Sequence, residues 1–255
     1  MNLRPKKHLG QNFLINEEIA ENIVKSLVLK KSENIVEIGP GKGALTKFIV
    51  QKSNHVKLIE IDLSCVELLK KEFQKLTVIH DNFLKIELNT LGFKKYALIG
   101  NFPYNISSQI LFHALKYRNN ITEIVGMFQK EVAERICSKP NSKKYGVLSV
   151  ILQAYFNCEL LFDVSPKDFY PKPKINSTVI RLARNKKKQL DCKHEDFIAI
   201  VKGGFSQRRK KLKNALKKIT NLDDNKNLEP ILEKRAENLS VSEFVMLTNY
   251  IFEKK

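Results

Sequence analysis

The chain has 255 residues and carries 45 Lys and Arg against 27 Asp and Glu, which gives a formal net charge of +18. Its hydrophobic content of 43% is enough for a packed core and excludes wholesale disorder, and no apolar run approaches the roughly 18 residues of a membrane span. No long apolar run follows the basic N-terminus, and the four Cys residues form no C-x-x-C pair, so we expect a cytoplasmic protein without a secretory leader.

Short β-rich runs alternate with stretches of helical periodicity over the first part of the chain. We expect strands at residues 33–39, 55–62, 76–81, 96–101 and 123–128. Helical spacing of apolar residues predicts helices at 43–53, 65–76, 107–117 and 129–136. Ser107 or Ser108 is the candidate N-cap of the third of these helices. Strands separated by helices of this length predict βαβ units and therefore an α/β fold with a mostly parallel sheet.

Two later segments, 147–164 and 177–184, have the composition of long strands. We expect them to form an antiparallel hairpin at one edge of the otherwise parallel sheet. The polar, charged stretch 184–189 has no periodicity, which predicts a linker.

The remaining residues have helical periodicity, and a capping box of Ser240 and Glu243 begins the last helical stretch. The expected helices cover 194–219, 228–236 and 240–255. We therefore divide the chain into an α/β domain of residues 1–183, the linker and a small helical domain of residues 190–255.

Positive charge is concentrated in the C-terminal part of the sequence. Residues 179–255 hold 19 basic and 10 acidic side chains, whereas residues 1–178, more than twice as many, hold 26 and 17. Seven basic residues lie between positions 208 and 218. Such a cluster is typical of a surface that binds the phosphates of a nucleic acid, and it is also compatible with a merely solvated helix face.

A glycine-rich turn follows the first expected strand of the sheet. Glu37 and Gly39 end the strand, Gly41 follows, and Glu60 ends the next strand, 21 residues after Gly39. Glycines permit a tight turn and a close approach of a ligand, and the second carboxylate can accept hydrogen bonds from ribose hydroxyls. The pattern predicts a site for an adenine nucleoside or a dinucleotide, so an NAD-dependent oxidoreductase remains open.

Asp81 ends the third expected strand, on the side of the sheet where ligands of open α/β folds bind. Its carboxylate is a candidate acceptor for the amino group of a bound adenine. The alternative is a turn cap, which is the commoner role of an isolated Asp at a strand end.

The motif Asn101-Phe102-Pro103-Tyr104 follows the fourth expected strand. The amino nitrogen of adenine is a poor nucleophile because its lone pair is delocalised into the ring. The side-chain oxygen of Asn101 and the carbonyl of Phe102 can accept hydrogen bonds from that nitrogen and favour an available lone pair. Pro103 fixes φ in the turn, and the ring of Tyr104 can stack on the base. The motif predicts methyl transfer to an adenine amine without a covalent intermediate.

These residues resemble a class I S-adenosylmethionine-dependent methyltransferase and, more narrowly, the ribosomal RNA adenine dimethylases. The resemblance runs nearly end to end. It rests on His8-Leu9-Gly10-Gln11-Asn12-Phe13-Leu14, Glu37-Ile38-Gly39-Pro40-Gly41, Asn101-x-Pro103-Tyr104-Asn105-Ile106-Ser107, Gln129-Lys130-Glu131-Val132, Pro140-Asn141-Ser142-Lys143-x-Tyr145-Gly146, Phe169-x-Pro171-x-Pro173-Lys174-x-x-Ser177, Gly204-Phe205-x-x-Arg208-Arg209-Lys210 and Arg235-Ala236-Glu237-x-Leu239-Ser240.

The resemblance implies a Rossmann-like fold and a role for each matching residue. The cofactor would be S-adenosylmethionine, held by Asn12, Leu14, Glu37, Gly39, Gly41, Glu60, Asp81 and Asn101. Asn101, Phe102, Pro103 and Tyr104 would form the catalytic motif, and Phe169 would stack on the flipped adenosine opposite Tyr104. Phe102 departs from the family, in which Leu or Ile is common at this position.

The resemblance is greatest to the small-subunit branch of the family, which dimethylates two adjacent adenosines in a hairpin loop near the 3′ end of 16S ribosomal RNA. We expect a monomer that acts on the small ribosomal subunit or its precursor, with Arg208, Arg209, Lys210 and Lys211 as phosphate contacts. The five His residues have no ligand spacing, so we expect no metal.

An oxidoreductase would leave the Asn101 motif unexplained. Two other functions remain open. One is the large-subunit adenine methylase that confers macrolide resistance, which shares the pocket motifs. The other is a ribosome-assembly factor with dispensable catalysis, which the intact Asn101, Pro103 and Tyr104 disfavour.

Overall fold

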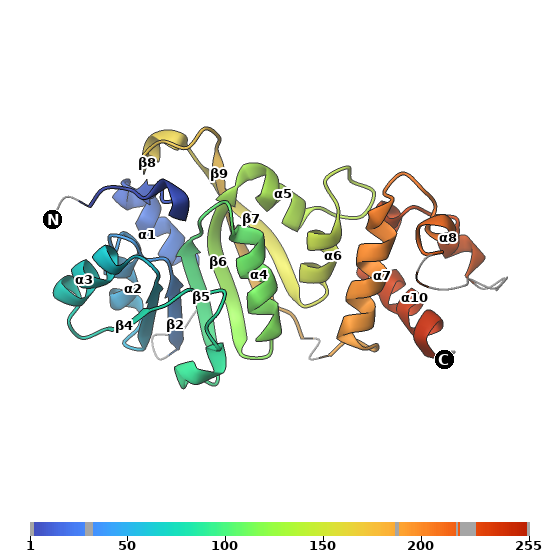
Figure 1. Cartoon of the computed structure of the whole chain (residues 1–255), viewed down its shortest axis with the longest axis horizontal. Coiled ribbons are helices and arrows are strands. Elements are labelled where there is room, and N and C mark those ends of the chain that lie inside the picture. The colour runs from blue at the N-terminus through green and yellow to red at the C-terminus, as the bar shows by residue number, and fades with distance from the viewer. Residues whose placement is uncertain (1–2, 29–32, 187–188, 218, 220–227, 254–255) are drawn as a thin grey trace. The chain divides into compact units, whose positions relative to one another are not determined.

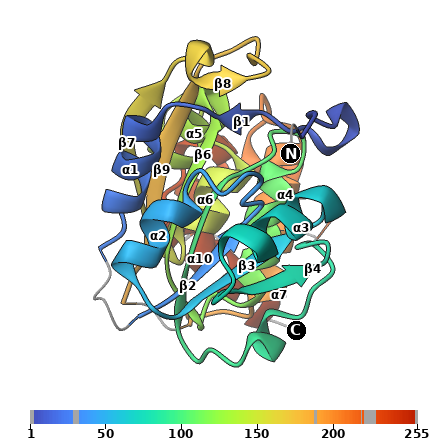
Figure 2. The same cartoon turned by 90° about the vertical axis from the view of Figure 1, so that its left-hand side faces the viewer.

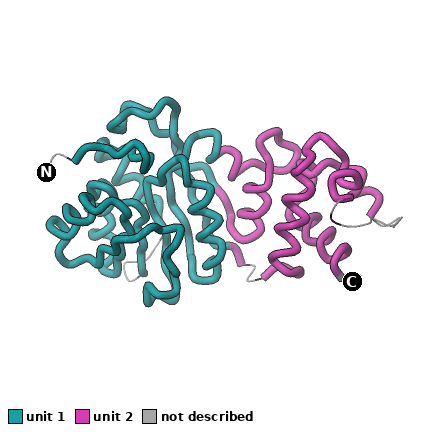
Figure 3. The backbone as a smooth tube through the Cα atoms, in the orientation of Figure 1, with its two compact units in different colours: residues 1–133, 159–184 teal, residues 134–158, 185–255 magenta. Residues whose placement is uncertain are grey.

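The structure is a computed structural model that describes residues 3–28, 33–186, 189–217, 219 and 228–253 (Figure 1). It divides into two compact units (Figure 3). Unit 1 is Met1–Ala133 with Glu159–Arg184, and unit 2 is Glu134–Cys158 with Asn185–Lys255. Residues 134–158 thus group with the C-terminal helices, unlike in the expected division at residues 183–190. Residues 187–188 of the expected linker and Lys218 of the basic cluster lie outside the described residues.

The described residues form one seven-stranded sheet of order β4-β3-β2-β5-β6-β9-β7 and a two-stranded ribbon of β1 and β8 (Figures 1 and 2). Neighbouring strands from β4 to β6 are parallel, and β9 pairs with β6 antiparallel. The α/β fold with antiparallel pairing near one edge is therefore confirmed. The strands are β1 (Phe13–Leu14), β2 (Asn34–Ile38), β3 (Val56–Glu60), β4 (Thr77–His80), β5 (Tyr96–Asn101), β6 (Ile121–Gln129), β7 (Phe156–Val164), β8 (Phe169–Tyr170) and β9 (Ser177–Arg184).

Both faces of the central strands are buried, as the continuous apolar runs predicted. On β2, Ile35 joins a core cluster with helix residues such as Ile23 and Ile49, while the next residue, Val36, is buried as well. Successive side chains of a strand point to opposite faces, so apolar cover is needed on both. The helices of this part are α1 (Glu17–Lys25), α2 (Thr46–Lys52), α3 (Leu63–Glu72), α4 (Ser107–Lys116) and α5 (Lys130–Cys137), with short 3-10 turns at Lys7–Leu9, Leu88–Leu91 and Pro166–Asp168.

The expected N-cap of α4 was wrong. The N-cap is Ile106, and Ser107 is the first helical residue, whose hydroxyl donates to the carbonyl of Tyr104 at 3.2 Å. The serine thus stabilises the turn of the Asn101 motif rather than the free amides of the helix.

Residues 147–164 are not one long strand, contrary to the expectation. Val147–Gln153 form helix α6, and only Phe156–Val164 form β7. A short apolar run fits a buried helix and a buried strand equally well, so periodicity alone cannot decide. Here the hydroxyl of Ser149 accepts from the Gly146 amide at 3.0 Å, which caps the helix, and Leu148–Leu152 are buried.

The expected helix at 194–219 is divided into two. Helix α7 (His194–Ser206) ends at Gln207, whose φ and ψ of −128° and 63° are not helical, and α8 (Leu212–Ala215) begins five residues later. The amide of Leu212 donates to the carbonyl of Lys234 at 2.8 Å, which holds the broken segment against another part of unit 2. The remaining helices are α9 (Glu229–Leu232), a 3-10 turn at Ala236–Asn238 and α10 (Val241–Glu253).

The capping box before α10 is confirmed. The amide of Ser240 donates to Glu243 Oε2 at 2.7 Å, and the amide of Glu243 donates to the Ser240 hydroxyl at 3.2 Å. None of the helices that the structure describes is long and apolar enough to cross a membrane.

Candidate methyltransferase pocket

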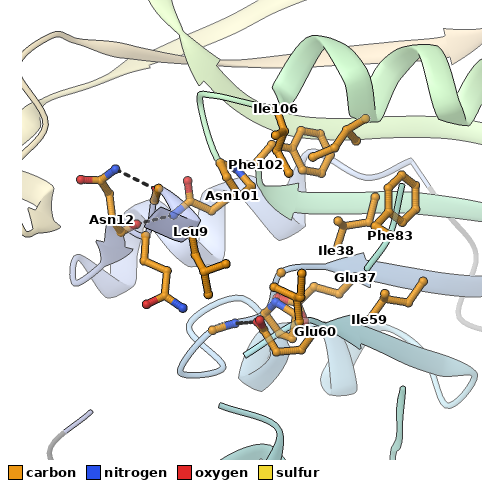
Figure 4. A pocket seen from close by; sticks show the side chains of 18 of the residues that line it. Leu9, Asn12, Glu37, Ile38, Ile59, Glu60, Phe83, Asn101, Phe102 and Ile106 are labelled. Carbon is orange, nitrogen blue, oxygen red and sulfur yellow. Dashed lines mark hydrogen bonds between the residues drawn. The ribbon is translucent and has the colours of Figure 1, made fainter. Parts of the chain in front are cut away.

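The carboxyl ends of β2, β3, β4 and β5 open into one pocket within unit 1 (Figure 4). The structure brings all the predicted catalytic and cofactor-binding residues to its lining, namely Asn12, Leu14, Glu37, Gly39, Gly41, Glu60, Asp81, Asn101, Phe102, Pro103 and Tyr104. They come from separate strand ends and from the N-terminal segment, so only the folded sheet assembles them.

The glycine turn requires glycine on backbone grounds. Gly39 and Gly41 have φ values of 64° and 57°, in the left-handed region. A Cβ atom added to Gly39 would meet nothing within 4 Å, whereas one on Gly41 would lie 3.0 Å from the ring of Phe13. The backbone at Gly39 therefore faces open space that a ligand can fill.

Glu60 is buried at the end of β3, and its carboxylate is bound by main-chain amides. Oε2 accepts from the Gly41 amide at 2.9 Å (Figure 4). Oε1 accepts from the Asp62 amide at 2.8 Å. Burial raises the pKa of Glu60 above its usual value, and these amide bonds oppose the rise. Each oxygen keeps a second lone pair, so the carboxylate can also accept from ribose hydroxyls.

Glu37 lies deeper, below the glycine turn. Its Oε2 accepts from the hydroxyl of Thr46 at 2.6 Å, and burial raises its pKa to about 8. Asp81, in contrast, is exposed at the rim, where its Oδ1 accepts from the Asn82 amide at 2.6 Å. This contact joins neighbouring residues, and the cap of the turn comes from Asn82, whose Oδ1 accepts from the Leu84 amide at 3.0 Å. The Asp81 carboxylate lines the pocket.

The amide group of Asn101 has a defined orientation. Its Nδ2 donates to the carbonyl of Asn12 at 2.8 Å (Figure 4). The Nδ2 of Asn12 itself donates to the Gly10 carbonyl at 3.2 Å. Because the donor side of Asn101 is occupied by the main chain, its Oδ1 is left to accept a hydrogen bond from a substrate amine.

Phe102 fits because two facing glycines leave room for its ring. Gly100 on β5 is paired with Gly126 on β6, and a Cβ atom on either would lie 2.6 or 2.3 Å from that ring. The ring packs edge-on against Phe128, with centroids 5.2 Å apart. Phe102, where the family commonly has Leu or Ile, therefore fills the space that the two glycines leave.

Tyr104 and Phe169 differ in their accessibility. The Tyr104 hydroxyl forms a 2.6 Å hydrogen bond with the hydroxyl of Ser177, and burial raises the pKa of the phenol. Phe169 is 1% exposed, packs into the core and does not line the pocket. Stacking of Phe169 on a target base would therefore require its side chain to move, and the role stays a prediction.

A polar clamp that the sequence did not reveal holds the N-terminal segment beside the pocket. Asp62, just beyond β3, accepts from Lys6 Nζ at 2.6 Å and from Gln11 Nε2 at 2.8 Å. Burial opposes the ionised form, yet the hydrogen bonds from Lys6 and Gln11 hold the pKa of Asp62 below its usual value. The only signal in the sequence was the position of Gln11 within a family motif.

The four predicted phosphate contacts lie in unit 2 and differ in their partners. Arg208 donates to Glu237 at 2.8 Å and to the carbonyls of Ser142 and Lys143, and Lys211 pairs with Glu233. Arg209 and Lys210 are exposed and form no ion pair with any described residue. In the part of the chain that the structure describes, no group of His, Cys, Asp and Glu side chains could hold a metal.

Comparison with sequence families gives one match, which covers nearly the whole chain. A family model described as ribosomal RNA adenine dimethylase matches residues 2–253. A Cytophaga hutchinsonii protein named ribosomal RNA small subunit methyltransferase A is 49% identical over 98% of both chains. A Flavobacterium johnsoniae protein of the same name is 48% identical, over 98% of this chain and 96% of its own.

Two solved structures share the fold at low sequence identity. A dimethyladenosine transferase from Plasmodium falciparum superposes with a TM-score of 0.81 at 24% identity, over 93% of this chain and 97% of its own. The 23S rRNA methyltransferase ErmE gives a TM-score of 0.74 at 22% identity, over 94% and 99%. At these identities the likeness establishes the class I methyltransferase architecture alone.

Proposed function

Because the chain belongs to the ribosomal RNA adenine dimethylase family, we propose that it dimethylates the amino groups of two adjacent adenosines near the 3′ end of small-subunit ribosomal RNA. The relatives named small-subunit methyltransferases, at 48 and 49% identity over nearly full length, support this branch over the large-subunit one. The observation that carries the chemistry is Asn101, whose amide is turned by the Asn12 carbonyl so that its oxygen can accept.

The pocket fits S-adenosylmethionine, the cofactor of the family. The open backbone at Gly39, the carboxylate of Glu60 and the rim carboxylate of Asp81 would hold its methionine part, ribose and adenine in turn. Glu37 would support the turn from below, and Asn12 and Leu14 would cover the ligand. When bound, the cofactor supplies an electrophilic methyl group on a positively charged sulfur.

The chain's own residues supply position and electrostatics. Asn101 Oδ1 and the Phe102 carbonyl accept hydrogen bonds from the target amine, which favours a lone pair directed at the methyl group. Pro103 fixes the turn that presents both acceptors, and the Tyr104 ring, anchored by Ser177, supports the base. The amine gains a methyl group and loses a proton in each transfer. Phe169 would close on the opposite face of the base.

We place the RNA-binding surface in residues 190–255, with Arg208, Arg209, Lys210 and Lys211 as phosphate contacts. Since Arg208 and Lys211 already pair with carboxylates, Arg209 and Lys210 should contribute more to RNA affinity. We also propose that the enzyme acts in the cytoplasm as a monomer, on the small subunit or its precursor during ribosome biogenesis.

The test is methyl transfer from labelled S-adenosylmethionine to small subunits that lack adenine dimethylation, with large subunits in parallel. We expect dimethyladenosine in small-subunit RNA alone. Labelling of large-subunit RNA instead would select the resistance-type activity. Tight binding to small subunits without transfer would indicate an assembly factor and contradict the proposed enzyme.

A further inference from the structure

The loop of residues 171–176, between β8 and β9, is joined at both ends to residues of the methyltransferase site. At its start, Tyr170 is paired with Phe13 in the β1–β8 ribbon, and Phe13 lines the pocket (Figure 2). At its end, Ser177 binds the hydroxyl of Tyr104 at 2.6 Å. Both ends are thus fixed to residues of the methyltransferase site.

The side chain of Tyr170 is on the opposite face of this ribbon from that of Phe169. Directly paired residues of an antiparallel ladder point to the same face, and successive residues point to opposite faces. Leu14 and Phe169 therefore share one face, where both are buried in the core. Phe13 and Tyr170 share the other, where Tyr170 is 60% exposed although it is aromatic.

The rest of the loop is exposed, stiff and basic. Lys172 and Lys174 are exposed and form no ion pair with any residue within the described ranges, and Ile175 is 44% exposed. Pro171 and Pro173 fix φ at alternate positions, which restricts the loop before any ligand arrives. Of the motif Phe169-x-Pro171-x-Pro173-Lys174, the family resemblance gives a role to Phe169 alone.

An exposed aromatic ring followed by two unpaired lysines suits single-stranded nucleic acid, where bases stack on rings and cations neutralise phosphates. We propose that Tyr170 stacks on a base that flanks the target adenosines, and that Lys172 and Lys174 hold the neighbouring phosphates. The inference rests on the proposed RNA substrate. It adds a subsite beside the pocket that fixes which nucleotide enters, distinct from the target-base contacts of Tyr104 and Phe169.

This subsite acts on substrate binding and leaves the chemical step to Asn101 and Tyr104. Stacking on an aromatic side chain contributes about 1–3 kcal/mol per base, which corresponds to roughly five- to 150-fold in affinity. The lysines contribute through counterion release, so their effect falls as salt rises.

The experiment compares Tyr170→Ala, Tyr170→Leu and Tyr170→Phe in the full-length enzyme, with unmethylated small subunits as substrate. We expect Tyr170→Ala and Tyr170→Leu to raise KM about tenfold with kcat unchanged, and Tyr170→Phe to stay within about twofold of wild type. Calorimetric binding of S-adenosylhomocysteine checks that each variant keeps its fold. An unchanged KM in Tyr170→Ala, or full activity in Tyr170→Leu, would overturn stacking.

A second arm separates RNA from a protein partner. Affinity for protein-free small-subunit RNA is measured by filter binding for the same variants. We expect the same loss as with whole subunits. A loss confined to whole subunits would mean that Tyr170 contacts a ribosomal protein, and would overturn the base subsite. If the wild-type enzyme methylates no small subunits at all, the proposed function fails instead.

The charge component is tested by Lys172→Gln with Lys174→Gln. The slope of log affinity against log salt should fall by about one to two units, because two phosphate contacts are lost. The matched control, Lys71→Gln with Lys75→Gln, removes two exposed lysines at the end of α3 and in the turn before β4 and should leave the slope unchanged. Equal slopes in both double variants would show that Lys172 and Lys174 do not contact RNA phosphates.

Discussion

Phe102 occupies space that Gly100 and Gly126 leave open on two paired strands. The sequence identified Phe102 as unusual for the family but could not identify its partners, because Gly126 is 24 residues away in a different strand. Only the register of β5 with β6 brings the two together. The side chain of Phe102 thus serves packing against these two strands, and its main-chain carbonyl remains available for the substrate amine.

Gly126→Ala should lower the free energy of unfolding by about 1–3 kcal/mol, because its Cβ would lie 2.3 Å from the buried Phe102 ring. Adding Phe102→Leu should restore part of that loss, so the two effects are not additive. Urea unfolding measures both variants, and Gly146→Ala, where a Cβ meets nothing within 4 Å, is the control. If the losses of the two single substitutions simply added in the double variant, the packing of the Phe102 ring would not depend on Gly126.

Glu37 makes stability depend on pH. Its pKa is about 8 in the folded chain and near 4.5 when unfolded, so the folded state holds more protons between these values. Stability from this group therefore falls as pH rises from about 4.5 to 8 and is level outside that window. Glu37→Gln, which keeps an acceptor for Thr46, should gain stability relative to wild type across this range. If the difference in free energy of unfolding between Glu37→Gln and wild type were the same at pH 5 and pH 8, the raised pKa of Glu37 would be contradicted.

At the scale of elements, the parallel strands β2 to β6 were predictable, whereas the short strands β1 and β8 and the helices of unit 2 were less so. Strand β5 was expected at 96–101 and is found there, because its apolar run is followed closely by Pro103, which ends the strand. Helix α6 was misassigned because VLSVILQ is mostly apolar, and so short an apolar run does not show the periodicity that distinguishes a helix from a strand. The break after α7 depends on contacts with distant residues, which no local pattern contains.

The candidate site was predictable for a related reason. Its polar residues lie where parallel strands end, so the strand prediction brought Glu60, Asp81 and Asn101 to one edge of the sheet. The clamp on Asp62 was not predictable, since Lys6 is one of many lysines and its partner is 56 residues away.

The clamp holds the N-terminal segment, which supplies Asn12 and Leu14 to the pocket. Asp62→Asn keeps a side chain that can cap α3 but weakens the bond to Lys6. We expect a several-fold higher Kd for S-adenosylmethionine, measured by calorimetry, with little loss of stability. Glu21→Gln removes the exposed pair with Lys25 away from the pocket and serves as the control. An unchanged Kd in Asp62→Asn would separate the clamp from cofactor binding.

At the scale of the whole molecule, the net charge of +18 favours association with RNA, but the cations are not equivalent. Neutralising Arg208, Arg209, Lys210 and Lys211 together should weaken RNA binding and flatten its salt dependence. Arg209→Gln with Lys210→Gln should account for most of that change, because the other two cations already pair with Glu237 and Glu233. Filter binding across a salt series measures the slopes. An unaltered slope in the fourfold variant would move the RNA surface elsewhere.

We propose that Asn101 activates the amine of an adenosine in small-subunit RNA. The most direct measurement is the mass of the RNA fragment carrying the 3′ hairpin, followed over time with wild type, Asn101→Ala and the exposed control Asn89→Ala. We predict two methyl groups on each of two adjacent adenosines for wild type and Asn89→Ala, and a rate more than tenfold lower for Asn101→Ala. Near-normal transfer by Asn101→Ala would contradict the role of Asn101, and methyl groups on any other base would contradict the adenosine substrate.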